Sequence, residues 1–167
     1  MVPGFRLTSL LRRRPKSARV DRVAPWLFVG PALDAAGYRD LRDRGVTHVV
    51  DLREEDADDP GLMASLGLKW LRLPIPDRKA PAPGQLDELR SWLAVDSGEG
   101  DPVLYIHCHA GLGRTPTVAI ALLMHHDMPL RDAHRHVRAA RPGAQPTASQ
   151  DAYLEDLARR IQWRGTR

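Results

Sequence analysis

The sequence of 167 residues predicts a single α/β domain with a mostly parallel central sheet of four to five strands flanked by helices. Three observations support this fold class. Short apolar runs of strand length alternate with stretches of helical spacing, which is typical of crossover units in a parallel sheet. A content of 43% hydrophobic and 28% charged residues is ordinary for a globular protein with its own core. Residues 102–124 follow the pattern of a strand, a tight loop and a helix.

The charge is distributed unevenly along the chain. Residues 1–20 contain six Arg or Lys residues and no acid, so the rest of the chain has 19 basic and 21 acidic residues. The net charge of +4 therefore belongs to this segment and does not indicate a nucleic-acid-binding face. We expect residues 1–20 to be a flexible basic tail, with weak docking to an anionic surface as the alternative, and residues 21–167 to form one folded domain.

Composition also limits the environment of the protein. The single cysteine excludes an internal disulfide and suits a reducing compartment. No apolar run approaches the length of a membrane span, and the apolar stretch near the N-terminus is too short for a signal peptide. We expect a cytoplasmic monomer without a membrane span.

The first elements follow from apolar spacing and from breakers. A strand over residues 23–30 is expected at a sheet edge, because Pro25 cannot donate to a ladder on both sides. Helical spacing over 31–44 stops at Gly45, and a β-branched strand over 46–52 completes a crossover unit. The later expected elements are a helix over 60–66, a strand over 68–73, a helix from 84, a strand over 102–106, and helices over 117–124, 130–140 and 151–163.

The run of acidic residues after the strand over 46–52 is most simply a solvated surface loop. Arg53 nevertheless lies at the end of that strand. Because the carboxyl ends of parallel strands converge on the ligand crevice, Arg53 is a candidate for a residue that borders the site.

The chemistry is concentrated in the loop His107-Cys108-His109-Ala110-Gly111-Leu112-Gly113-Arg114-Thr115. Only five residues separate Cys108 from Arg114, so the loop must curl, and Gly111 and Gly113 can take the positive φ that curling requires. Curling turns backbone N–H groups inward at a helix N-terminus and forms a nest for an anion. The planar guanidinium of Arg114 suits two oxygens of a phosphate, and the nest stabilises Cys108 as a thiolate. The predicted phosphate-binding residues are His109, Ala110, Gly111, Leu112, Gly113 and Arg114.

Several different roles for this loop fit its residues less well. A buried structural cysteine accounts for neither the glycines nor the arginine. A Walker loop requires Lys where Arg114 stands, and the cysteine loop of a rhodanese-type sulfur carrier is typically one residue shorter. A metal site on His107, Cys108 and His109 fails because adjacent residues at a strand end point in opposite directions.

This loop resembles the CX5R signature of the cysteine-dependent protein phosphatases, the superfamily of tyrosine and dual-specificity enzymes. Their pattern is His-Cys, five residues, Arg, then Ser or Thr, with glycine at the third and fifth positions after the cysteine. Every position is matched here, and the resemblance extends over about residues 22–163. The chain shows no extra segment for a deep phosphotyrosine slot, which favours the dual-specificity branch.

The expected reaction needs a proton donor for the leaving oxygen. Asp77 is the best candidate, because it follows a strand on a loop held out of regular structure by four prolines, at residues 73–83. The resemblance agrees, since these phosphatases place their general acid about 30 residues before the cysteine, and here the separation is 31. An aspartate that only serves a turn is the alternative.

Further residues are expected to support the reaction. Thr115 should donate a hydrogen bond to the sulfur of Cys108. The resemblance implies that His107 orients the loop. It also implies that Gln150 or Gln145 positions the water of the second step, although a structural hydrogen bond explains either residue equally well.

The predicted function is hydrolysis of phosphate monoesters, namely phosphotyrosine and also phosphoserine or phosphothreonine of proteins, through a phosphocysteine on Cys108. No metal or organic cofactor is expected, because the thiolate and the nest supply what a metal would. Two alternatives remain open: a phosphatase of a small phosphorylated metabolite or lipid, and a non-catalytic module of the same fold that binds phosphoproteins.

Overall fold

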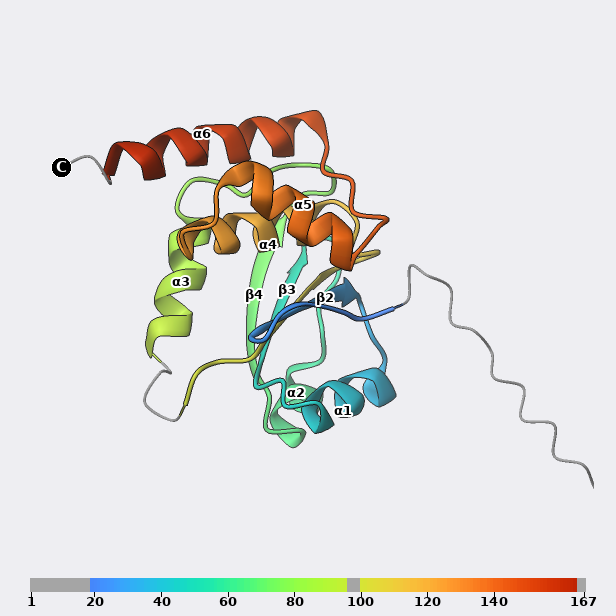
Figure 1. The fold of residues 1–167 in the computed structure, drawn as a ribbon. Helices are drawn as coiled ribbons and strands as arrows, with labels where there is room; N and C mark the ends of the chain where they lie inside the picture. The colour runs from blue at the N-terminus through green and yellow to red at the C-terminus, as the bar shows by residue number, and fades with distance from the viewer. Residues whose placement is uncertain (1–18, 96–99, 165–167) are drawn as a thin grey trace, which may run out of the picture.

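The computed structural model describes residues 19–95 and 100–164, and its centre is a five-stranded sheet with helices on both faces (Figure 1). The strands are β1 (Asp21–Ala24), β2 (Leu27–Pro31), β3 (His48–Arg53), β4 (Lys69–Ile75) and β5 (Leu104–Cys108). Their order is β1-β2-β5-β3-β4; β1 is antiparallel to β2, and the other pairs are parallel. The predicted fold class is confirmed.

The first predicted strand is wrong in one respect. Instead of one edge strand over residues 23–30, the chain forms a hairpin in which β1 and β2 are separated by a turn at Pro25 and Trp26. Proline has no N–H for the ladder and fits a turn, so it ends β1. Strand β1 therefore lies at the edge of the sheet, and β2 is fully buried beside β5.

Six helices cover the sheet in the described part of the chain: α1 (Ala35–Asp43), α2 (Pro60–Ser65), α3 (Gln85–Val95), α4 (Arg114–His125), α5 (Leu130–Ala140) and α6 (Ala148–Arg164). Alternate strand residues point to opposite faces of the sheet and pack into two separate hydrophobic cores, one on each face. Val49 packs with Tyr38 of α1 and Met63 of α2, whereas Val50 packs with residues of α3, α4, α5 and α6. Helix α4 is apolar and buried over most of its length, because it lies between the sheet, α5 and α6.

Most predicted boundaries hold within a few residues, and α5 has the predicted range. Two differences affect the site. Helix α4 begins at Arg114 rather than at residue 117, and α6 begins at Ala148 rather than at 151. Of the predicted basic tail, residues 1–18 lie outside the described residues; Arg19 is part of the fold, since its carbonyl accepts a hydrogen bond of 2.8 Å from Arg141. None of the described helices has the length and apolar character needed to cross a membrane.

Candidate active site

The predicted phosphate loop, residues 108–114, lies where the central strand β5 passes into α4. Strand β5 is flanked by β2 and β3, and all three run parallel, so their carboxyl ends meet at one edge of the sheet. Cys108 ends β5 and Arg114 begins α4. The predicted succession of strand, short loop and helix is therefore present, and it brings the nucleophile candidate to the helix N-terminus.

The two glycines of this loop have different roles. Gly111 has φ +70°, as predicted, and its N–H donates to Cys108 Sγ over 3.3 Å. A Cβ on Gly111 would collide with the carbonyl of Gly30, so no larger residue fits. The prediction of positive φ at Gly113 is wrong, since its φ is −120°. Gly113 instead lies against the amide of Gln150, which is 3.4 Å from the position of a Cβ.

A pocket of about 600 Å³ collects most of the predicted site residues. Cys108, Arg114 and Asp77 all line it. Asp77 reaches this pocket because its loop leaves β4 at the edge of the sheet where β5 also ends. The lining also includes His109, Ala110, Leu112, Gly113, Glu54, Glu55, Arg78, Gly143, Gln145 and Thr147.

Arg114 is held in place along one edge of its guanidinium. Nη1 and Nη2 each donate to a carboxylate oxygen of Glu55 over 2.7 Å, and Nη1 also donates to the Ile75 carbonyl over 2.9 Å. Nη2 is 3.5 Å from Asp77 Oδ1. The hydrogen bond with Glu55 raises the pKa of Arg114 and lowers the pKa of Glu55 to about 2. The buried Nε finds no acceptor among the described residues, so it is available to a bound anion.

Glu55 is a site residue that the sequence analysis missed. The acidic run after β3 has the composition of a solvated loop, but its second glutamate forms the bidentate pair with Arg114. In the sequence, Arg53 is a candidate because it lies at the carboxyl end of a parallel strand, and the same reasoning applies to Glu55 two residues later. Chain that leaves a parallel strand at its carboxyl end lies near the ligand crevice.

Arg53 does not line the pocket, contrary to the prediction that it borders the site. Its side chain is buried and donates to three carboxylates, with distances of 2.8 and 2.9 Å to Asp51, 2.9 Å to Asp58 and 2.7 Å to Asp56. The hydrogen bonds to Asp51 raise the pKa of Arg53, against the opposing effect of burial. These carboxylates turn the guanidinium away from the crevice.

Among the described residues, Asp51, Asp58 and His107 form the one group whose ligand atoms are close enough to hold a metal ion, within 4.8 Å of one another. Arg53 donates to both of the aspartates in this group. A fixed cation therefore already neutralises the carboxylates, and the group forms an ion-pair cluster behind the phosphate loop.

His107 is fully buried and has the kind of contacts that an orienting residue needs. Its Nε2 is 2.7 Å from Asp58 Oδ2 and 3.1 Å from the Tyr38 hydroxyl, and its Nδ1 is 3.2 Å from the Cys108 carbonyl. Burial alone would raise the pKa of Asp58, but the hydrogen bonds from His107 and Tyr38 outweigh it and lower that pKa. Burial and the neighbouring Asp58 raise the pKa of Tyr38.

The predicted bond from Thr115 to the sulfur is not formed. The hydroxyl of Thr115 is buried and has no hydrogen-bond partner among the residues described, so it does not donate to Cys108. In this structure the sulfur instead accepts from the N–H of Gly111.

Gln150 does not line the pocket, whereas Gln145, the second candidate, does. Gln150 is fully buried, and both ends of its amide are engaged. Its Oε1 accepts from Thr147 N over 2.8 Å, and its Nε2 donates to the Lys79 carbonyl over 2.9 Å. The structure therefore shows Gln150 in the structural hydrogen bonds that were the alternative to a role toward water.

Arg141 is a second residue that the sequence analysis missed, since its sequence context indicates only a helix end. Its buried guanidinium donates to the carbonyls of Gly111 and Ala110 over 2.6 and 2.8 Å, and to Asp21 over 2.8 Å. By binding the carbonyls of the phosphate loop from outside, Arg141 favours the conformation in which the N–H groups face inward.

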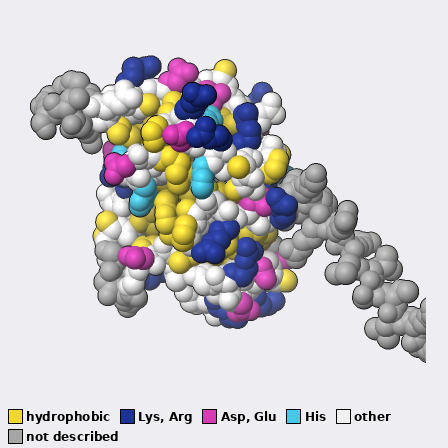
Figure 2. Space-filling model, viewed as in Figure 1, with side chains coloured by type: hydrophobic (Ala, Val, Ile, Leu, Met, Phe, Trp, Pro, Cys, Tyr) yellow, Lys and Arg dark blue, Asp and Glu magenta, His cyan; other side chains and the backbone are white. Residues whose placement is uncertain are grey.

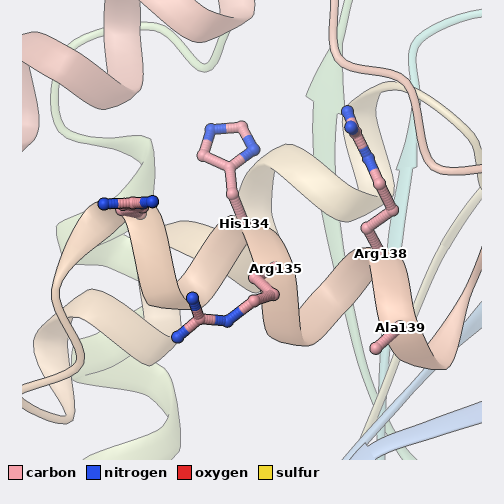
Figure 3. Close-up of a pocket in the computed structure, with 5 residues that line it drawn as sticks. His134, Arg135, Arg138 and Ala139 are labelled. Atoms are coloured by element: carbon pink, nitrogen blue, oxygen red, sulfur yellow. The ribbon is translucent and has the colours of Figure 1, made fainter.

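A second depression, of about 560 Å³, lies on the outer face of α5. Basic side chains gather over this helix in Figure 2, and Figure 3 shows His134, Arg135 and Arg138 projecting from it. Among the described residues, no thiol or carboxylate lines this depression, so it lacks both the nucleophile and the acid that the pocket at Cys108 provides.

Comparisons with known proteins show the family of the chain and agree with its fold. Residues 30–128, more than half of the chain, match the family described as "Polymorphic toxin system, DSP-PTPase phosphatase". The chain is 30% identical over 142 residues to human Dual specificity protein phosphatase 12, covering 78% of this chain and 41% of that protein. It is 29% identical over 146 residues to Dual specificity protein phosphatase 22 of Xenopus tropicalis, covering 84% of this chain and 65% of that protein. The chain thus spans less than two thirds of the length of either relative.

The fold is also shared with solved structures. The crystal structure of Tk-PTP in the active form superposes with a TM-score of 0.75 at 32% identity, covering 84% of this chain and 97% of the other. The family match, the sequence relatives and the similarity to the Tk-PTP structure all assign the chain to the same superfamily. The chain belongs to the dual-specificity-like branch of the cysteine-dependent protein tyrosine phosphatase superfamily.

Proposed function

We propose that the protein hydrolyses phosphate monoesters of phosphorylated proteins, phosphotyrosine and also phosphoserine or phosphothreonine, through a phosphocysteine on Cys108. The observation that carries this proposal is the convergence of three groups on one pocket: the sulfur of Cys108, the guanidinium of Arg114 with its unpaired Nε, and the carboxylate of Asp77. The two sequence relatives named above, both called protein phosphatases, support a protein substrate.

In the first step the phosphate enters the nest and Arg114 binds two of its oxygens. The thiolate of Cys108 attacks phosphorus, and the bond from phosphorus to the ester oxygen breaks. Asp77, protonated, gives its proton to that departing oxygen, so an alcohol or phenol leaves rather than an alkoxide.

In the second step water attacks the phosphorus of the phosphocysteine. Asp77, now a carboxylate, takes a proton from this water, and the thiolate of Cys108 leaves as inorganic phosphate forms. The N–H of Gly111, 3.3 Å from Sγ, stabilises the negative charge on sulfur both before attack and after departure. Apart from substrate and water, every group named in the two steps belongs to this chain.

The test is turnover of p-nitrophenyl phosphate by the wild type and by Cys108→Ser, combined with acid-quench trapping. We expect the wild type to release p-nitrophenol and to yield a phosphoryl group attached to Cys108, while Cys108→Ser binds phosphate and loses turnover by a factor of about 10³ or more. Normal turnover by Cys108→Ser would exclude the covalent mechanism.

Substrate class needs a separate measurement. Phosphopeptides carrying phosphotyrosine, phosphoserine or phosphothreonine are compared with a panel of sugar, nucleotide and lipid phosphates at equal concentration. The proposal expects the highest kcat/KM on a phosphopeptide. A metabolite or lipid phosphate hydrolysed faster than every phosphopeptide would leave the mechanism in place and overturn the protein substrate.

A further inference from the structure

The loop that carries Asp77 needs support from elsewhere in the fold. Asp77 itself is exposed, with 74% of its side chain accessible, and its carboxylate approaches Arg114 only to 3.5 Å. Arg78, the next residue, has φ +62°, a left-handed conformation that is unfavourable for a residue with a Cβ. Such a conformation persists only where surrounding contacts impose it.

Those contacts come from the start of α6. The Arg78 carbonyl accepts hydrogen bonds from the hydroxyls of Thr147 and Ser149, over 3.0 and 3.2 Å. The next carbonyl, that of Lys79, accepts from the amide of Gln150 over 2.9 Å. Two consecutive carbonyls directly after Asp77 are therefore bound by three side chains. We call these three side chains, Thr147, Ser149 and Gln150, the acid-loop seat.

The same segment is attached to the phosphate loop. Gln145 N donates to the Leu112 carbonyl over 2.8 Å, and the amide of Gln150 lies against Gly113. Gln150 is fully buried, and it also accepts from Thr147 N over 2.8 Å. Residues 145–150 thus contact the phosphate loop on one side and the acid loop on the other, which fixes the distance between them.

We propose that Thr147, Ser149 and Gln150 are positioning residues for the general acid: they hold the loop of Asp77 at the distance from Cys108 that protonation of the leaving group requires. The inference deepens the proposed function and rests on it, because it assigns the role of these residues through Asp77. It also gives Gln150 a role in the first chemical step, in place of the water-positioning role expected from the sequence.

The test removes the two hydroxyls, since Thr147 and Ser149 lie nearer the surface than Gln150. The main variant combines Thr147→Val with Ser149→Ala, and it is made both in the wild type and in Asp77→Asn. Two controls accompany it: Thr147→Ser, which keeps the hydroxyl, and Ser65→Ala, which removes a comparable hydroxyl-to-carbonyl bond of 2.8 Å in α2. For each, kcat is measured on p-nitrophenyl phosphate, which has a good leaving group, and on phenyl phosphate, which has a poor one.

We expect the double variant to lose about tenfold to a hundredfold in kcat on phenyl phosphate, because a misplaced acid costs that much, and less than about threefold on p-nitrophenyl phosphate. In the Asp77→Asn background the same double substitution should lower kcat no further, because Thr147 and Ser149 act only by positioning the carboxylic acid that this background lacks. Thr147→Ser should retain the rate on phenyl phosphate because it retains the hydrogen bond, and Ser65→Ala should keep wild-type rates on both substrates.

Three outcomes overturn the inference: equal losses on both substrates, no loss on either, or an equal loss with and without Asp77. Each of these leaves the proposed function intact if Asp77→Asn alone shows the larger loss on phenyl phosphate. If Asp77→Asn itself keeps full kcat on phenyl phosphate, Asp77 is not the general acid. The part of the proposed function that uses Asp77 is then wrong, and so is the positioning role inferred here.

Discussion

Arg114 shows how one residue is prepared for an anion. Glu55 binds one edge of its guanidinium with two hydrogen bonds of 2.7 Å, which fixes the plane of the fork. The pairing leaves Nε without a partner among the described residues. A bound phosphate then meets a donor whose orientation is already set, so little conformational freedom is lost on binding.

Glu55→Gln tests this arrangement. The amide keeps the shape of the side chain but loses the charge and one acceptor, so we expect kcat/KM on p-nitrophenyl phosphate to fall about tenfold, or about 1.4 kcal/mol. Asp56→Asn, which alters the neighbouring exposed carboxylate, is the matched control and should fall less than about twofold.

Glu55 also carries a prediction about pH. Because the pKa of Glu55 is lowered to about 2 from its ordinary 4.5, the carboxylate stays charged as pH falls through 4.5, and the pair is lost only near pH 2. Titration of Glu55 therefore does not contribute to the acid limb of kcat/KM between about pH 4 and 7. An NMR titration of the Glu55 carboxyl should find it charged throughout that range, and protonation near 4.5 would contradict the lowered pKa.

At the scale of elements, the phosphate loop is shaped by the strands and helices on either side of it. Gly111 packs against the carbonyl of Gly30 in β2, and Arg141, at the end of α5, binds the carbonyls of Ala110 and Gly111. Further support comes from the residue after β2, since Ala32 N donates to the His109 carbonyl over 3.1 Å. The conformation of the loop therefore depends on β2 and α5, which lie far from it in the sequence.

Gly111→Ala separates backbone strain from this close packing. Both Gly111, at φ +70°, and Gly67, at φ +67°, would strain an alanine, but only Gly111 of the two has a backbone atom within 4 Å of the new Cβ. We expect Gly67→Ala to cost about 1–2 kcal/mol of stability with full activity. Gly111→Ala should cost about 3 kcal/mol or more and abolish turnover, as measured by denaturant unfolding and p-nitrophenyl phosphate hydrolysis. Equal effects of the two substitutions would show that packing against Gly30 does not shape the loop.

At the scale of the whole molecule, a buried polar cluster lies at the catalytic edge of the sheet, on the face that packs against α1 and α2. Arg53 donates to Asp51 and Asp58, and Asp58 contacts His107 and Tyr38. This cluster connects β3 and α1 to His107 of β5, the residue before Cys108. Changes in the cluster should therefore affect both the stability of the fold and the position of Cys108.

Asp58→Asn should therefore change stability as well as activity. Removing one charge from a buried pair typically costs about 3 kcal/mol at neutral pH. Because the folded pKa of Asp58 lies below its ordinary 3.8, its carboxylate stabilises the fold above that pH, and the stabilisation is lost as pH falls further. The difference in unfolding free energy between wild type and variant should thus shrink as pH falls below about 4. The control Asp43→Asn, at an exposed ion pair, should change little at any pH. A difference that grew as pH fell below about 4 would contradict the lowered pKa of Asp58.

Features that lie close together in the chain can be predicted from local sequence patterns. Cys108, Gly111 and Arg114 lie within seven residues, so their spacing alone predicts the curl of the loop, and the periodicity of apolar residues predicts the strands and helices around it. The predicted start of the Asp77 loop at residue 73 is wrong, because Pro74 lies within β4. The loop itself is predictable from its place after a strand and from its prolines. The hairpin at Pro25 is not, because a short apolar run does not reveal where it folds back.

The side chains that complete the site come together only when the chain is folded. Glu55 meets Arg114 across 59 residues, Arg141 meets Gly111 across 30, and Gln150 meets Lys79 across 71. Three residues that the sequence suggests for the site do not have the expected contacts. The packed fold directs Arg53 and Gln150 toward structural partners. It leaves the hydroxyl of Thr115 without the expected bond to sulfur. The direction of a side chain depends on the register and packing of distant elements, which local patterns do not encode.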